Sequence, residues 1–217
     1  MSSAREEIIN RVRAAISRKV GDKPAAPPEP LLRIRGYKLD EKIAAFRAAL
    51  EALSGTVTET HSRAETQSAV KRLLDGRTAV ASAHPLLAEQ WVTEIEVVQS
   101  GLTGADLRNA CASAGVGITS AYCLLAETGT IVFRASAEES RLISLLPPVH
   151  IAVVSSRRML GGLDEMLSMI ARPVDDSSAM VFITGPSRTG DIEQILVRGV
   201  HGPGHVHVVI VHEEDIR

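Results

Sequence analysis

Residues 179–196 read AMVFITGPSRTGDIEQIL, in which an apolar strand pattern runs into a glycine-rich loop. The apolar run covers 180–184, and Asp191-Ile192-Glu193 after the loop begins a helical pattern. Glycine lets a backbone turn sharply and approach a ligand, while a following helix presents unpaired N–H groups and a positive dipole end. The segment therefore predicts a strand–loop–helix unit whose loop binds an anion. The alternative is an ordinary connection in which Asp191 only caps a helix.

The side chains of this loop suit a carboxylate or a phosphate. Hydroxyl groups and a guanidinium donate hydrogen bonds to such anions, although the Gly-Lys-Ser/Thr ending of a P-loop is missing. The candidate ligand-binding residues here are Gly185, Ser187, Arg188, Thr189, Asp191 and Glu193.

The same alternation of strand and helix extends over most of the chain. Helical spacing occurs at 39–53, 63–74, 102–114 and 163–170, and apolar β-branched runs occur at 56–59, 78–82, 95–98, 116–119, 149–154 and 206–211. Two further runs, 121–126 and 130–133, are separated by a short turn. This order predicts an α/β fold with a largely parallel sheet, helices on both faces and an antiparallel hairpin. In such sheets, ligands bind at the carboxyl ends of the strands.

The N-terminal residues form a separate segment. Apolar residues recur at helical spacing over 4–20, and residues 21–30 contain four prolines, which exclude helix and central strand. We expect an amphipathic helical arm over 1–20, a Pro-rich linker over 21–38 and one domain over 39–217. The arm either packs on the domain or docks onto a partner.

Composition excludes several classes of protein. A net charge of -2 and an aromatic content of 3% do not favour nucleic-acid binding. The N-terminus lacks the apolar core of a signal peptide, and no stretch is long enough for a membrane span, so we expect a cytoplasmic protein. The only cysteines, Cys111 and Cys123, are too few for an iron–sulfur cluster, and no metal-ligand spacing is present.

Three further segments contain candidate functional groups. Glu127 lies at the turn between two apolar runs, where a carboxylate is either a functional acid or a turn residue that accepts backbone hydrogen bonds. His201 lies in the loop Gly199-Val200-His201-Gly202-Pro203-Gly204, where it and Gly202 either contact an anion or only form the loop. His150 either points into the crevice that would bind the ligand or begins a strand at an exposed edge of the sheet. We therefore take Glu127 and His201 as candidate catalytic residues, and Gly202 and His150 as candidate ligand contacts.

Together these segments resemble the LUD (lactate utilisation) domain family. The matching residues are Ala126-Glu127-Thr128-Gly129-Thr130, Leu146-Pro147 with His150, Thr184 to Glu193, and Gly199-Val200-His201-Gly202-Pro203, in the same order and spacing. The resemblance covers about residues 40–212 and implies a Rossmann-related fold of the NagB/RpiA/CoA-transferase-like type.

The resemblance also implies a function. Members of that family work with iron–sulfur partner proteins in oxidising L-lactate to pyruvate. We therefore expect an accessory subunit that holds no iron–sulfur cluster itself and binds a small carboxylate or phosphate. The alternative is a free-standing enzyme, either a CoA transferase with a Glu nucleophile or an ATP-dependent relative of 5-formyltetrahydrofolate cyclo-ligase. A small-molecule sensor on the same scaffold is a third interpretation.

Overall fold

The computed structural model describes residues 4–15, 36–170, 177–192 and 195–212. The helix α1 (Ala4–Ala15) belongs to a unit of its own, residues 1–32, and all other elements belong to a second unit, residues 33–217. The expected Pro-rich segment over 21–30 lies outside the described residues. Among the described helices, none is long and apolar enough to cross a membrane.

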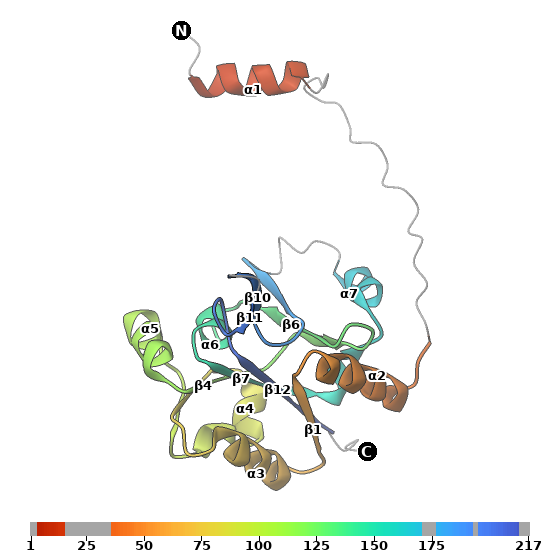
Figure 1. Ribbon diagram of the computed structural model, residues 1–217, viewed down its shortest axis with the longest axis vertical. Helices are drawn as coiled ribbons and strands as arrows, with labels where there is room; N and C mark the ends of the chain where they lie inside the picture. Colours follow the sequence, from red (N-terminus) through yellow and green to blue (C-terminus); the bar gives the residue numbers. More distant parts are fainter. Residues whose placement is uncertain (1–3, 16–35, 171–176, 193–194, 213–217) are drawn as a thin grey trace. The chain divides into compact units, whose positions relative to one another are not determined.

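A six-stranded sheet forms the centre of the second unit (Figure 1). Every pairing in it is parallel. Its strands, in spatial order, are β1 (Thr56–Thr60), β12 (His205–Val211), β7 (Val149–Ser155), β4 (Val116–Thr119), β2 (Ala79–Ala81) and β3 (Val98–Gln99). The prediction of a largely parallel, Rossmann-like sheet is therefore confirmed.

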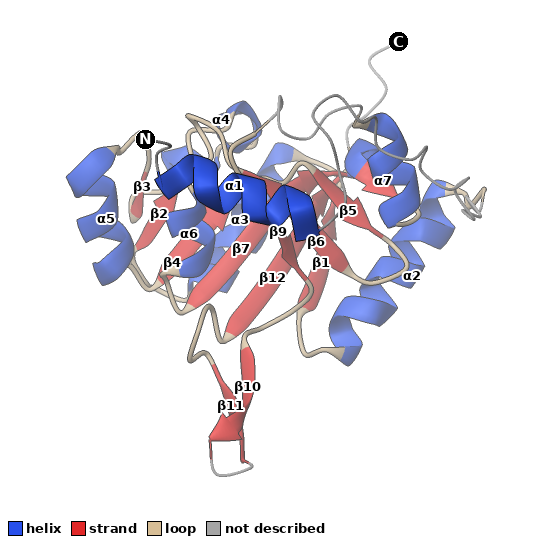
Figure 2. Cartoon of the chain, turned by 90° about the horizontal axis from the view of Figure 1, so that it is seen from above, coloured by secondary structure: helices blue, strands red, loops and turns tan. Residues whose placement is uncertain are grey.

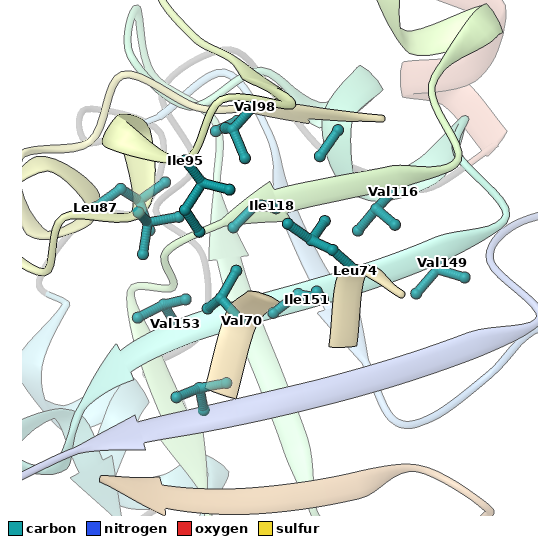
Figure 3. Close-up of a cluster of buried hydrophobic side chains, with 14 of the residues drawn as sticks. Val70, Leu74, Leu87, Ile95, Val98, Val116, Ile118, Val149, Ile151 and Val153 are labelled. Carbon is teal, nitrogen blue, oxygen red and sulfur yellow. The ribbon is translucent and has the colours of Figure 1, made fainter. Parts of the chain in front are cut away.

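Helices cover both faces of this sheet (Figure 2). On one face, Val70 and Leu74 of α3 (Arg63–Leu74) and Leu87 of α4 (Pro85–Glu89) pack against alternate residues of the strands, as Figure 3 shows. On the other face lie α2 (Leu39–Ala52), α5 (Gly104–Ser113) and α6 (Arg141–Leu145). The central strand β7 is buried along its whole length, so apolar side chains are required on both sides of it.

A second, smaller sheet packs, together with α2, on the same face of the six-stranded sheet as α5 and α6. Its strands, in spatial order, are β8 (Met159–Leu160), β5 (Cys123–Leu125), β6 (Thr130–Arg134) and β9 (Met180–Ile183). The strands β5 and β6 form the expected antiparallel hairpin. The helix α7 (Leu163–Met169) covers the outer face of this sheet through Met166.

Several elements differ from the sequence-based prediction. The short helices α4 and α6 were not expected, because one turn shows no periodicity. The strand expected over 95–98 is shifted, since Val92–Glu94 (η1) forms a 3₁₀ turn and β3 begins at Val98. A second 3₁₀ turn, η2, covers Ser156–Arg158.

The helix expected after Gly190 is the main error. The backbone there forms an antiparallel hairpin of β10 (Arg188–Ile192) and β11 (Ile195–Arg198), which projects from the rest of the domain in Figure 2. Thr189, Ile192, Ile195 and Val197 are β-branched, and their preference for extended backbone outweighs the helical pattern of so short a segment.

Gly117 allows α6 to lie directly on β4. A Cβ atom at this position would lie 1.8 Å from the carbonyl oxygen of Ile143 in α6. We predict that Gly117→Ala lowers the free energy of unfolding by about 1–3 kcal/mol, the usual cost of overpacking a core. Urea denaturation measures this change. Gly36→Ala is the matched control, because a Cβ there would contact nothing within 4 Å. An equal loss of stability in both variants, or none in either, would contradict the close contact.

Candidate functional site

Two of the predicted loops do come together. The Ser187 N–H donates to the carbonyl oxygen of Pro203 at 2.9 Å, and the Gly199 N–H donates to that of Ser187 at 3.0 Å. The His201 N–H donates to Ser187 Oγ at 3.3 Å. The His201 side chain is exposed, and Gly202 lies beside Ser187. The segments that resemble one family therefore meet in space.

These loops lie at the amino edge of the large sheet. The loop 199–204 leads into β12, and the Gly204 N–H donates to the Pro148 carbonyl just before β7 at 2.9 Å. For the loop 199–204 this agrees with the sequence, which puts that loop just before the final strand. For the loop 185–190 it does not, because the predicted strand-to-helix unit after Gly190 would put that loop at the carboxyl ends of the strands.

Arg188 contacts the protein itself. Its guanidinium donates to the Leu53 carbonyl oxygen and, at 3.3 Å, to Ser54 Oγ, both at the C-terminal end of α2. Gly185, with φ of 113°, lies against Leu53. A cation at this end of a helix satisfies free carbonyl groups and the negative end of the dipole. Arg188 therefore ties the segment 185–188 to α2.

Glu127 lies in the turn between β5 and β6. Its N–H donates to the Gly161 carbonyl oxygen at 2.9 Å, and its exposed carboxylate lies beside Gly162, where a Cβ would come within 2.7 Å of Oε2. Gly129, with φ of 62°, brings this turn against the backbone of Leu50 in α2. No hydrogen bond or salt bridge joins Glu127 to His201, the other candidate catalytic residue, within the described ranges.

His150 is fully buried on β7, a central strand, so the expectation of an exposed edge is wrong. Its Nε2 is 2.8 Å from Thr119 Oγ1, and Nδ1 has no hydrogen-bond partner within the described chain. Burial and, to a smaller extent, the neighbouring His207 together lower the pKa of His150 to about 4, so the imidazole is neutral at neutral pH. Thr189 and Asp191 lie in β10, and Glu193 lies outside the described residues.

A cavity lined by none of the candidate site residues opens at the carboxyl edge of the large sheet. It has a volume of about 290 Å³ and lies where β2, β4 and β7 end and the smaller sheet begins. The polar and charged residues that line it are His84, Glu89, Ser120, Tyr122, Arg134, Ser136, Glu139, Ser155 and Arg158. The size and this mixture of groups are typical of a small-molecule site.

Two arginines supply positive charge to the cavity. The guanidinium carbon of Arg134 is 4.5 Å from the centre of the Tyr122 ring, which holds the half-buried side chain in place. Arg158 follows β7 and is exposed. Neither arginine forms a salt bridge within the described part of the chain, so both are free to pair with an anion.

His84 adds a neutral hydrogen-bond donor. Its Nδ1 accepts from the Leu86 N–H at 3.2 Å at the start of α4, so Nε2 carries the ring hydrogen. Burial lowers the pKa of His84, and the positive charge of Arg158 lowers it further, while Glu89 and Glu138 oppose this. The imidazole therefore donates from Nε2 at neutral pH.

Glu139 is the buried carboxyl of the cavity wall, with 6% of its surface exposed. Its Oε1 accepts from the Ser120 N–H at 3.0 Å, while neither Oε2 nor the neighbouring Ser82 Oγ has a hydrogen-bond partner of normal geometry within the described residues. Burial raises the pKa of Glu139 to about 7, and the interactions with Ser120 and Ser82 offset only part of that rise. A carboxyl group that titrates near neutral pH in a cavity is typical of a functional site.

A sequence signal for this cavity did exist. His84, Ser120 and Ser155 each lie at or just after the end of a predicted strand, at the edge where parallel sheets bind ligands. Glu139 gave no such signal, because Ser136-Ala137-Glu138-Glu139-Ser140 has the composition of an exposed loop.

We predict a pH-dependent cost of burying Glu139. Because its pKa is higher in the folded chain than the ordinary 4.5, the folded state holds a proton that the unfolded state has lost. The contribution of Glu139 to stability is therefore full below pH 4.5 and is lost as pH rises through about 7, by about 3 kcal/mol.

Urea denaturation of the unchanged chain and of Glu139→Gln at pH 5 and pH 8 measures this effect. The free energy of unfolding of the unchanged chain, relative to that of the variant, should be lower at pH 8 than at pH 5. The control is Glu138→Gln, which changes the exposed neighbour. Its difference in free energy of unfolding from the unchanged chain should stay nearly the same at pH 5 and pH 8. A constant difference for Glu139→Gln would show that its carboxyl group ionises normally.

Comparison with known proteins relates the whole domain to one family. The family model for the LUD domain matches residues 43–211. Lactate utilization protein C of Geobacillus thermodenitrificans is 31% identical in an alignment of 195 positions that covers 81% of this chain and 80% of that protein. Lactate utilization protein C of Bacillus subtilis is 29% identical in an alignment of 228 positions that covers 95% of each chain.

A solved structure agrees with the fold. The crystal structure of a DUF162-family protein from Deinococcus radiodurans superposes with a TM-score of 0.63 at 22% identity, over 81% of this chain and 99% of that one. With the family model matching 43–211 and the relative at 31% identity, this chain belongs to the LUD-domain family.

Proposed function

We propose that this protein acts in lactate utilisation as a component that holds no iron–sulfur cluster and binds a small carboxylate, L-lactate or pyruvate, in the carboxyl-edge cavity. The observation that carries this proposal is the cavity, in which Arg134 and Arg158 have no carboxylate partner among the described residues. The names of the relatives support the metabolic role.

The cavity offers complementary groups for such a ligand. A guanidinium binds a carboxylate through paired hydrogen bonds, which Arg134 and Arg158 would supply. The Nε2–H of His84 would donate to a further oxygen of the ligand. Tyr122 and Phe133 line the same cavity and would contact its methyl group. Each polar atom of a hydroxy or keto acid would thus find a partner.

Redox chemistry in this proposal belongs to iron–sulfur partner proteins. Burial raises the pKa of Cys123 to about 12 and also raises the pKa of Cys111, so both thiols are protonated at neutral pH. An iron–sulfur cluster normally takes four cysteine thiolates, and the sequence has two cysteines. The alternative of an enzyme with Glu127 as nucleophile has less support, because Glu127 is not part of the cavity wall.

We predict that Arg158→Ala weakens the binding of L-lactate or pyruvate by about 1.5–3 kcal/mol, because a hydrogen-bonded charge is removed from the ligand. Isothermal titration calorimetry measures the affinity. Arg188→Ala is the matched control, since Arg188 donates to Leu53 and Ser54 at the other edge, and it should bind as the unchanged chain does. Loss of binding in Arg188→Ala with no loss in Arg158→Ala would move the site to the amino edge.

The partnership has its own test. We predict that the tagged full chain retains iron–sulfur proteins from its native lysate, visible by their cluster absorbance, and that a variant lacking residues 1–30 loses them because the amphipathic arm docks onto a partner. Circular dichroism of the shortened chain checks that the domain remains folded. Recovery of the full chain without iron-containing proteins would count against the accessory role.

A further inference from the structure

The carboxyl group of Glu139 has no positive partner to keep it ionised. It lies in the cavity wall with 6% of its surface exposed, and no salt bridge reaches it from the described part of the chain. One backbone hydrogen bond from Ser120 serves Oε1, and beside Oε2 lies only the hydroxyl group of Ser82, without a hydrogen bond of normal geometry. An ionised carboxylate in this position would depend on these two neutral groups, which is costly in a buried site.

Charged groups around the cavity come from several elements. The charged and titratable residues that line the cavity with Glu139 are His84 before α4, Glu89 in α4, Arg134 in β6 and Arg158 in η2. Glu138 lies beside Glu139 and acts on it and on His84 through its charge. Arg141 of α6 lines an adjoining hollow. The negative charge of Glu138 favours the protonated form of Glu139. The arginines are the groups that would draw an anion into the cavity.

We infer that the cavity takes up its carboxylate ligand together with a proton, which Glu139 carries as a carboxylic acid and donates to a ligand oxygen. This inference rests on the proposed function, because it requires an anion in the cavity. A second negative charge a few ångströms from a buried carboxylate strongly favours protonation, and the O–H···O⁻ bond that then forms is short and strong. Binding and proton uptake are thereby linked.

The linkage has a definite direction with pH. The free protein holds Glu139 about half-ionised near pH 7, because burial raises the pKa of Glu139 to about 7. Above that pH the ligand must bind with a proton from solution, so the affinity should fall by up to about tenfold per pH unit. His84 also lies on the cavity and is neutral near pH 7, so it is the competing proton acceptor.

Titration calorimetry with L-lactate in Tris and in triethanolamine tests this inference. Both amines buffer at pH 8 and carry no anionic group that could occupy the anion site, and they differ in ionisation enthalpy, so the difference in heat gives the number of protons taken up. At pH 8 the unchanged chain should take up close to one proton, a result that requires no variant. Glu139→Gln, a permanently neutral hydrogen-bond donor, should bind L-lactate without proton uptake and with an affinity that does not change from pH 6.5 to 8.5.

The remaining outcomes separate the two proposals. Glu96→Gln, which changes an exposed carboxyl group outside the cavity wall, is the control and should take up protons as the unchanged chain does. Binding without proton uptake in the unchanged chain, or uptake that persists in Glu139→Gln and so points to His84, would overturn the inference and leave the proposed function standing. No binding of L-lactate by any of these proteins would overturn the proposed function and the inference with it.

Discussion

The parallel ladder between β12 and β7 is the constraint on which the rest of the structure depends. Seven residues of each strand pair in register, from His205 with Val149 to Val211 with Ser155, and β7 is buried throughout. Buried parallel strands leave little room for polar side chains on their faces, so chemistry is confined to the two edges where the strands begin and end. His150 is an example of a polar residue inside the sheet: its imidazole is neutral, and its Nε2 is hydrogen-bonded to Thr119 Oγ1.

The two edges differ in how their polar groups are used. At the amino edge, Arg188 and Ser187 form hydrogen bonds within the protein and fasten the glycine loops to α2 and to each other. At the carboxyl edge, Arg134 and Arg158 have no such partners in the described part of the chain, and Glu139 is buried at a cost to stability. Uncompensated charge and a carboxyl group of shifted pKa at one place are features that a protein retains for binding or catalysis.

The sequence predicts the fold better than the site, for physical reasons. Runs such as 116–119, 149–154 and 206–211 are long, apolar and β-branched, so their local preference agrees with their buried place in the sheet. The hairpin of β10 and β11 was mistaken for a helix because the segment is short and contains charges that also suit a helix start. Glu139 could not be found, because its burial and its bond from Ser120 come from strands distant in the chain.

A crystal structure of the protein with bound pyruvate would show at which end of the parallel strands the ligand binds. We expect the pyruvate carboxylate between Arg134 and Arg158, with one carboxylate oxygen within hydrogen-bond distance of Glu139. Pyruvate bound instead against Ser187 and His201 at the amino edge would contradict this expectation, and would assign the site to the glycine loops.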